Sequence, residues 1–166
     1  MNAKVLVIED DPNTRSLIEV YLEDEPFDAV FAEDGIQGLE YVKKNDVDIV
    51  VTDVRLPKIG GEELVPYINS LRPNLPVIVM TGYASVEGAV NFLRKGAFDY
   101  ITKPFTRHVF IHRLHLAAKH LQLLIEVDKL RADAKREDLD NILGDHQSIV
   151  KILSMLPSIS QTDASV

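Results

Sequence analysis

The chain has no cysteine and no tryptophan, and none of its 166 residues lies in an apolar run long enough to cross a bilayer. The absence of cysteine excludes disulfide bonds and thiolate metal sites. A membrane-spanning helix needs about 20 consecutive apolar residues. The first residues, Met1 to Lys4, lead directly into a strand pattern and do not resemble a signal sequence. We therefore expect a cytoplasmic protein that makes no contact with a membrane.

Basic residues are scarce in the first two thirds of the chain. Residues 1–106 carry 10 Lys and Arg against 18 Asp and Glu, whereas residues 107–166 carry 8 of each kind. Clustered cations give a protein its affinity for the nucleic-acid backbone, so we expect no direct DNA binding by this fragment. Apolar residues make up 46% of the chain, which is enough to close the core of one domain.

Short apolar runs alternate with helix-like segments, a pattern typical of repeated βα units and a parallel sheet. We expect five strands, at Val5–Ile8, Ala29–Ala32, Ile49–Thr52, Val77–Met80 and Tyr100–Thr102. The third and fourth strands are almost wholly apolar, which indicates that helices cover both faces of the sheet. The predicted fold is α/β: a flavodoxin-like, doubly wound, five-stranded parallel sheet of order 2-1-3-4-5 with an extended C-terminal helix.

Residues that start and stop helices fall between these strands. Asp11-Pro12 and Asp34-Gly35 each offer a side-chain acceptor at a helix N-cap, and Gly96 suits a left-handed residue that closes a helix. An apolar set in the first helix recurs at a spacing of three to four, so we expect it to form a buried face: Leu17, Ile18, Tyr21 and Leu22.

Polar residues follow four of the expected strands. Glu9 and Asp10 follow the first strand, Asp53 the third, Thr81 the fourth and Lys103 the fifth. Because the carboxyl ends of parallel strands lie along one edge of a sheet, we expect these side chains to meet in one crevice. Carboxylates are ligands for Mg²⁺, and a carboxylate can attack phosphorus to give an acyl phosphate. The sequence therefore predicts a magnesium-assisted phosphoryl-transfer site with Asp53 as the nucleophile.

The segment from Phe105 to Leu143 contains no Gly or Pro, so we expect one long helix there. One apolar stripe is predicted to cover the sheet: Phe110, Leu114, Ala117 and Leu121. A second stripe alternates by four and three, as the a and d positions of a coiled coil do: Leu116, His120, Leu123, Val127, Leu130 and Ala134, with Leu116, Leu123, Val127 and Leu130 as its large apolar members. We interpret the second stripe as a dimer helix. A helix that packs back on its own domain is the alternative.

Four motifs together resemble the receiver domain of two-component response regulators over residues 1–120: Glu9-Asp10-Asp11-Pro12, Asp53-Val54-Arg55-Leu56-Pro57 followed by Gly60, Thr81-Gly82, and Lys103-Pro104. The resemblance implies that Asp53 accepts a phosphoryl group from a sensor histidine kinase. It implies that Mg²⁺ is bound by Asp10, Asp53 and the backbone carbonyl of Arg55, with Glu9 completing the acidic pocket. It also implies that Thr81 and Lys103 contact the phosphoryl group and that Thr81 and Tyr100 form a switch.

Two later segments, Ile142-Leu143-Gly144-Asp145 and Gln161-Thr162-Asp163-Ala164-Ser165-Val166, resemble the opening of the AAA+ ATPase domain of NtrC-type, sigma-54-dependent activators. The G-x-x-x-x-G-K-[ST] loop of such a domain is missing from this chain. We predict a receiver domain over 1–120, a helical coiled-coil linker over 121–140 and a truncated start of an AAA+ domain over 141–166. The expected function is a phosphorylation-dependent response regulator that switches dimerisation and regulation of a sigma-54 activator ATPase.

Such a domain is regulatory and catalyses only its own phosphoryl transfer and dephosphorylation. A haloacid-dehalogenase-type phosphatase would need a second acid two residues after the nucleophile, where this chain has Arg55. A flavodoxin-type flavin site would need a Ser/Thr/Gly-rich loop after the first strand, where the acidic residues stand. The alternative that stays open is a phosphorylation-independent pseudo-receiver that acts as a protein-interaction module.

Overall fold

The computed structural model describes residues 2–82 and 86–154, without the side chains of residues 86, 87 and 89 and of those after Ala132. Strands and helices alternate along the chain. The strands are β1 (Ala3–Ile8), β2 (Phe27–Ala32), β3 (Ile49–Asp53), β4 (Val77–Thr81) and β5 (Asp99–Thr102). The helices are α1 (Pro12–Leu22), α2 (Gly35–Lys44), α3 (Gly61–Leu71), α4 (Val86–Arg94) and α5 (Arg107–Ser154).

The five strands form one parallel sheet of order β2-β1-β3-β4-β5, which confirms the predicted order. Each strand is longer than expected by one or two residues. Asp53 and Thr81 are therefore the last residues of β3 and β4, whereas the sequence pattern places each just after its strand. Their side chains start from ordered strand backbone, which holds them more firmly than a loop does.

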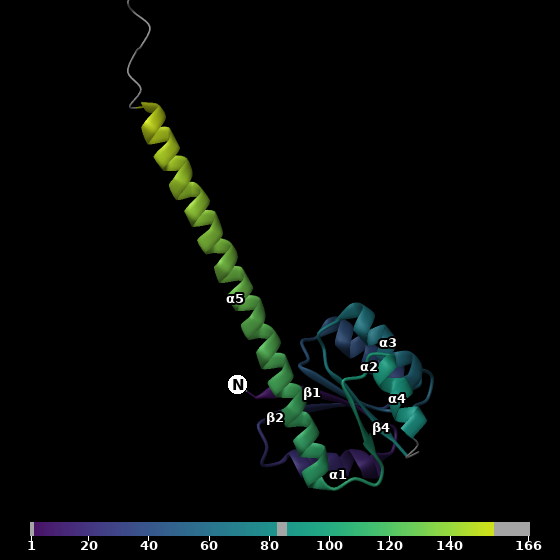
Figure 1. Ribbon diagram of the computed structural model, residues 1–166. Helices are drawn as coiled ribbons and strands as arrows, with labels where there is room; N and C mark the ends of the chain where they lie inside the picture. The colour runs from purple at the N-terminus through teal and green to yellow at the C-terminus, as the bar shows by residue number, and fades with distance from the viewer. Residues whose placement is uncertain (1, 83–85, 155–166) are drawn as a thin grey trace, which may run out of the picture. The chain divides into compact units, whose positions relative to one another are not determined.

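Helices lie on both sides of the sheet (Figure 1), and an apolar cluster on each face confirms the double winding. Leu6 and Ile8 of β1 join a cluster with buried residues of α2, α3 and α4. Val5 and Val7, the alternate residues of the same strand, join a second cluster with α1 and α5. Because successive side chains of a strand point to opposite faces, one apolar strand serves both layers.

The predicted helix ends are confirmed. The Asp11 carboxylate accepts hydrogen bonds from the backbone N–H groups of Asn13 and Thr14, and Asp34 accepts one from Gln37. Gly96 has a φ of 95°, in the left-handed region. The prediction of a buried face on α1 is wrong for Leu17, which is 43% exposed, whereas Ile18 and Leu22 are buried. The stripe that meets the sheet is narrower than the periodicity of the sequence indicated.

Helix α5 begins at Arg107 and continues through Gly144 to Ser154. Three residues of its first stripe, Phe110, Leu114 and Ala117, are wholly buried against the sheet. The chain divides into two compact units, Met1–Leu124 and Ile125–Val166. The segment Gln161–Val166, used above for the second resemblance, lies outside the described residues.

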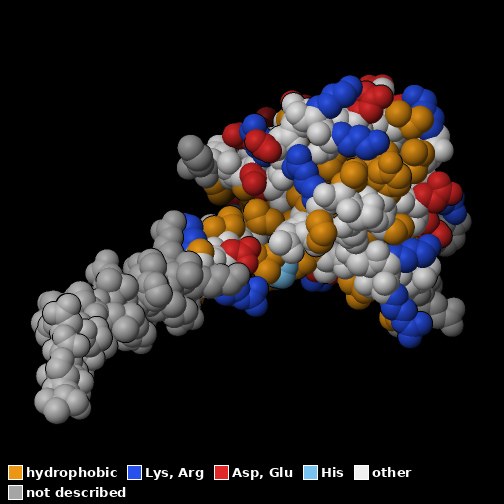
Figure 2. Space-filling view, turned by 90° about the horizontal axis from the view of Figure 1, so that it is seen from above, with side chains coloured by type: hydrophobic (Ala, Val, Ile, Leu, Met, Phe, Trp, Pro, Cys, Tyr) orange, Lys and Arg blue, Asp and Glu red, His pale blue; other side chains and the backbone are white. Residues whose placement is uncertain are grey.

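Residues of the second stripe are solvent-exposed: Leu116 by 38%, Leu123 by 52%, Val127 by 42% and Leu130 by 63%. Figure 2 shows apolar side chains at the surface among Lys and Arg side chains. Within the described part of the chain, no helix is both long and apolar enough to span a membrane.

Candidate functional site

Three carboxylates meet at the carboxyl edge of the sheet. Glu9 and Asp10 directly follow β1, and Asp53 ends the neighbouring strand β3. Each offers one oxygen, and these three oxygens lie within 4.8 Å of one another. Glu9 is only 1% exposed, whereas Asp10 is exposed and Asp53 is intermediate. Hard oxygen donors in this number suit a divalent cation such as Mg²⁺, which takes one or two carboxylates and keeps several waters.

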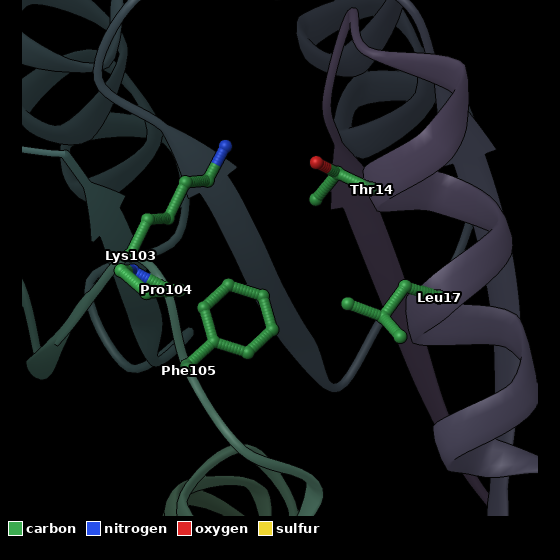
Figure 3. A pocket seen from close by; sticks show the side chains of 5 residues that line it. All are labelled: Thr14, Leu17, Lys103, Pro104 and Phe105. Carbon is green, nitrogen blue, oxygen red and sulfur yellow. The ribbon is translucent and has the colours of Figure 1, made fainter.

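Lys103 joins two of these carboxylates from the loop after β5. Its Nζ lies 2.6 Å from Oε2 of Glu9, and it also donates a hydrogen bond to Oδ2 of Asp53. The backbone N–H of Lys103 donates to the carbonyl of Thr81 at 2.7 Å, which ties the loop to the end of β4. The Lys103-Pro104 peptide bond is cis. Figure 3 shows the Lys103 amino group pointing away from the Phe105 ring.

Burial and pairing act against each other in this cluster. Burial raises the pKa of Glu9, and the hydrogen bond and charge of Lys103 only partly oppose that effect. Burial on its own lowers the pKa of Lys103, but hydrogen bonds and attraction from Asp53 and Glu9 outweigh it, so the pKa of Lys103 is raised. One ammonium thus faces more than one carboxylate. The excess negative charge favours a bound cation, because carboxylates held this close repel one another.

A cavity of about 170 Å³ opens beside Asp53. It is lined by residues from the ends of three strands and the segments that follow them: Asp53, Val54, Arg55, Thr81, Gly82 and Lys103. Thr81 is 7% exposed. The backbone N–H of Arg55 donates to Oδ1 of Asp53 at 2.8 Å, which leaves that carboxylate held by two different donors. The structure therefore brings the predicted carboxylate, hydroxyl and ammonium to one small cavity.

Tyr100 lies apart from this cavity. It belongs to β5, is paired with Val79 of β4, and packs half-buried against the apolar layer under α2, α3 and α4. Its neighbour Thr102 pairs with Thr81 at the end of the same two strands. The paired backbones of β4 and β5 thus connect Tyr100 with Thr81.

Two features that support the site were not found from the sequence. A Cβ on Gly61 would stand 2.7 Å from the carbonyl oxygen of Asp53, so only glycine allows α3 to start so close to the end of β3. Lys58, with a φ of 69°, reaches back to Oδ2 of Asp34 at 2.6 Å and holds the loop after Asp53 to the start of α2. The Gly60-Gly61 pair was the only signal in the sequence for the first feature. No local pattern indicated the second.

The chain matches the family model of the response regulator receiver domain over residues 5–115, and it belongs to that family. The transcriptional regulatory protein GlrR of Escherichia coli is 34% identical over 102 residues, which are 61% of this chain and 23% of GlrR. The response regulator protein PilR of Pseudomonas aeruginosa is 30% identical over 165 residues, which are 98% of this chain and 35% of PilR. The chain thus spans only about a quarter to a third of the length of these relatives.

A crystal structure of NtrX from Brucella abortus in complex with ADP matches with a TM-score of 0.73 at 31% identity. The match covers 78% of this chain and 30% of that one. The protein is therefore the receiver domain of a two-component response regulator, together with residues that continue beyond it. Both the resemblance to receiver domains and the predicted fold class are confirmed.

Proposed function

We propose that Asp53 accepts a phosphoryl group from a sensor histidine kinase with the help of Mg²⁺, and that this modification is the regulatory signal. The observation that carries the proposal is the cavity that Asp53, Thr81 and Lys103 line together next to the acidic cluster. The site offers a nucleophile, a hydroxyl donor and a cation within one space of about 170 Å³. Each of these groups is one that phosphoryl transfer uses.

In the proposed reaction an oxygen of the Asp53 carboxylate attacks the phosphorus atom, and the bond from phosphorus to the donor atom breaks. The electron pair of that bond leaves with the donor, an imidazole nitrogen of the kinase or the acetate oxygen of acetyl phosphate. Asp53 then carries an acyl phosphate. Lys103 exchanges its contact with Asp53 for a phosphoryl oxygen while Glu9 continues to hold its ammonium. The hydroxyl of Thr81 donates to another phosphoryl oxygen.

The donor set fits Mg²⁺, and Asp10, Asp53 and the backbone carbonyl of Arg55 are the groups that would hold it. The ion supplies positive charge that offsets the carboxylates and the incoming phosphoryl oxygens. Glu9 acts indirectly in this scheme. Its buried carboxylate, which also accepts the backbone N–H of Asp11 at 3.2 Å, positions Lys103.

Intact mass spectrometry after incubation with acetyl phosphate and Mg²⁺ tests the proposal. The chain should gain the mass of one phosphoryl group, and the gain should vanish with a chelator. It should also vanish in Asp53→Asn, whereas Asp46→Asn, at an exposed Asp outside the cluster, should be modified like the wild type. An unmodified wild-type chain that nevertheless binds Mg²⁺ would favour the pseudo-receiver, a protein-interaction module that works without phosphorylation.

We also propose how the signal is passed on. Thr81 moves toward the phosphoryl oxygens, Tyr100 follows, and the pairing of two α5 helices in a homodimer changes. The exposed stripe of Leu116, Leu123, Val127 and Leu130 supports this, because four large apolar side chains on one helix are costly to leave in water. Sedimentation equilibrium with and without beryllofluoride, a phosphoryl mimic, tests it. A monomer under both conditions would rule out the dimer switch.

The domain plan continues the same proposal. In this proposal residues 1–120 form the receiver, 121–140 the coiled-coil linker, and 141–166 the start of an AAA+ domain, whose G-x-x-x-x-G-K-[ST] loop does not occur in this sequence. The alignment with PilR over 98% of this chain supports a match that extends past the receiver. The full protein would then be a sigma-54-dependent activator whose ATPase is regulated by Asp53. ATP hydrolysis by a longer chain that includes the ATPase domain, measured before and after phosphorylation of Asp53, would test this step. An unchanged rate would contradict it.

A further inference from the structure

All five histidines of the chain lie in helix α5. Three of them, His108, His112 and His115, are spaced by four and three residues. With 3.6 residues per turn, this spacing places the three side chains on one face of the helix, within two turns. The phosphoryl-transfer site proposed above uses none of them.

This face borders a cavity of about 430 Å³ that is distinct from the cavity at Asp53. The lining residues are Glu25, Arg107, His108, Ile111, His112 and His115. The rings of His108 and His112 have centroids 6.2 Å apart and planes that differ by only 12°. Both side chains are exposed, so either ring can rotate without disturbing the core.

Glu25 brings a carboxylate to the same cavity from the segment between α1 and β2. Its Oε1 accepts a hydrogen bond from Arg107 at 2.9 Å, and its Oε2 lies 3.3 Å from Nε2 of His115. The His115 ring also packs on Phe27, with centroids 5.1 Å apart. Arg107 is paired with Glu25, so the positive charge of Arg107 is partly offset and repels a cation that enters the cavity less strongly.

We propose that His108 and His112 chelate a divalent transition-metal ion of the zinc class at this cavity. Two histidines four residues apart on one helix face can place a ring nitrogen of each on a single ion. Imidazole nitrogen suits zinc, nickel and copper, whereas Mg²⁺ prefers oxygen ligands. His115 and Glu25 line the same cavity, and the exposed side leaves coordination positions for water.

The alternative interpretation of these residues is a solvent-exposed helix face that is rich in histidine and binds no ligand. The positions of the histidines distinguish the two interpretations. Solvation alone makes no distinction between His112 and the nearby His120, whose ring packs on Phe98 with centroids 5.1 Å apart and which does not line the cavity. Chelation requires both His108 and His112 and does not depend on His120.

The test is titration of the untagged 166-residue chain with Zn²⁺, and separately with Ni²⁺, against a chromogenic chelator. Excess Mg²⁺ is present throughout to occupy the acidic cluster. One ion should bind per chain. His108→Ala and His112→Ala should each weaken binding at least about tenfold, the range seen when even a supporting contact of a metal site is lost. His120→Ala, the matched control, should bind like the wild type.

These variants alter exposed side chains, and far-UV circular dichroism checks that each one is folded. Ni²⁺ should also broaden the imidazole NMR signals of His108 and His112 before that of His120. The proposal is overturned if no ion binds, or if binding persists in the double variant His108→Ala/His112→Ala. It is equally overturned if binding is lost in Asp10→Asn and kept in the histidine variants, because the metal then occupies the acidic cluster.

Discussion

Replacing Lys103 by Met would remove the only ammonium that the structure shows bonded to both Glu9 and Asp53 among the described residues. Methionine keeps a flexible apolar side chain of similar length and removes the charge. Glu9, only 1% exposed, would then stand beside Asp53 without the ammonium that pairs with both carboxylates. We expect Lys103→Met to fold but to be less stable than the wild type at neutral pH.

The expected loss follows from the burial of the three groups. Removing one partner of a buried ion pair costs about 3–5 kcal/mol, because the other charge stays buried and unpaired. The side chains of Lys103 and Asp53 are 23% and 13% exposed, so water screens part of the electrostatic effect. We therefore expect a loss of about 2–3 kcal/mol, below the fully buried range. With a urea m-value of about 1–3 kcal/mol per molar, the unfolding midpoint falls by roughly 0.7–3 M.

Urea unfolding followed by circular dichroism measures this loss. Lys44→Met is the matched control, since Lys44 pairs at 3.1 Å with Glu40 on the surface of α2 and its side chain is 71% exposed. A pair of that kind contributes no more than about 0.5 kcal/mol. Saturating Mg²⁺ should narrow the gap between Lys103→Met and the wild type, because a bound cation replaces part of the lost charge.

The pH dependence gives a second readout of the same variant. The pKa of Glu9 in the folded protein is raised above 4.5, so the stability that Glu9 contributes is complete below pH 4.5 and is lost as the pH rises through the raised value. Lys103 lowers the pKa of Glu9, so removing Lys103 raises this pKa further and makes the loss of stability at higher pH larger. The difference between variant and wild type should therefore be greatest at neutral pH and shrink toward pH 4.5. A difference below about 0.5 kcal/mol at neutral pH, the size of an exposed pair, would show that Lys103 does not offset a buried charge on Glu9.

Three further predictions concern the scaffold and the dimer. Phe110→Ala, at a wholly buried position under the sheet, should lower the free energy of unfolding by about 3–5 kcal/mol in urea titrations. Gly61→Ala should reduce both stability and the rate of acetyl phosphate labelling, because its Cβ would clash with the Asp53 carbonyl. Gly82→Ala, whose Cβ would meet no atom of the described residues within 4 Å, should keep its stability. Leu123→Asp should shift sedimentation toward monomer if α5 pairs as proposed, while Gln122→Asp on a different face of the helix should not.

The strand order and the convergence at the sheet edge could be predicted from the sequence, because apolar runs and turn residues repeat at the period of βα units. The ends of β3 and β4 were misplaced by one residue, since propensity does not decide whether Asp53 or Thr81 takes the last strand position. Leu17 shows a second limit. Helical spacing identifies a face, but the width of that face depends on what packs against it.

Contacts between distant residues could not be predicted from the sequence. Glu9 and Lys103 are 94 residues apart, and strand order alone shows only that they share an edge of the sheet. The contact of Lys58 with Asp34 depends on the path of the loop after Asp53, which no local pattern specifies. Gly144 marked the expected end of the long helix, yet α5 continues through it. A glycine inside a helix costs only about 1 kcal/mol, which neighbouring residues can offset.

Reductive trapping can show whether Asp53 itself carries the phosphoryl group. An aspartyl phosphate is reduced by borohydride to homoserine, which peptide mass spectrometry can locate in the chain. After treatment with acetyl phosphate and Mg²⁺, we expect homoserine in place of Asp53 and at no other acid of the cluster. Homoserine in place of Asp10 or Asp11, or none at all in a chain that gains the phosphoryl mass, would contradict it.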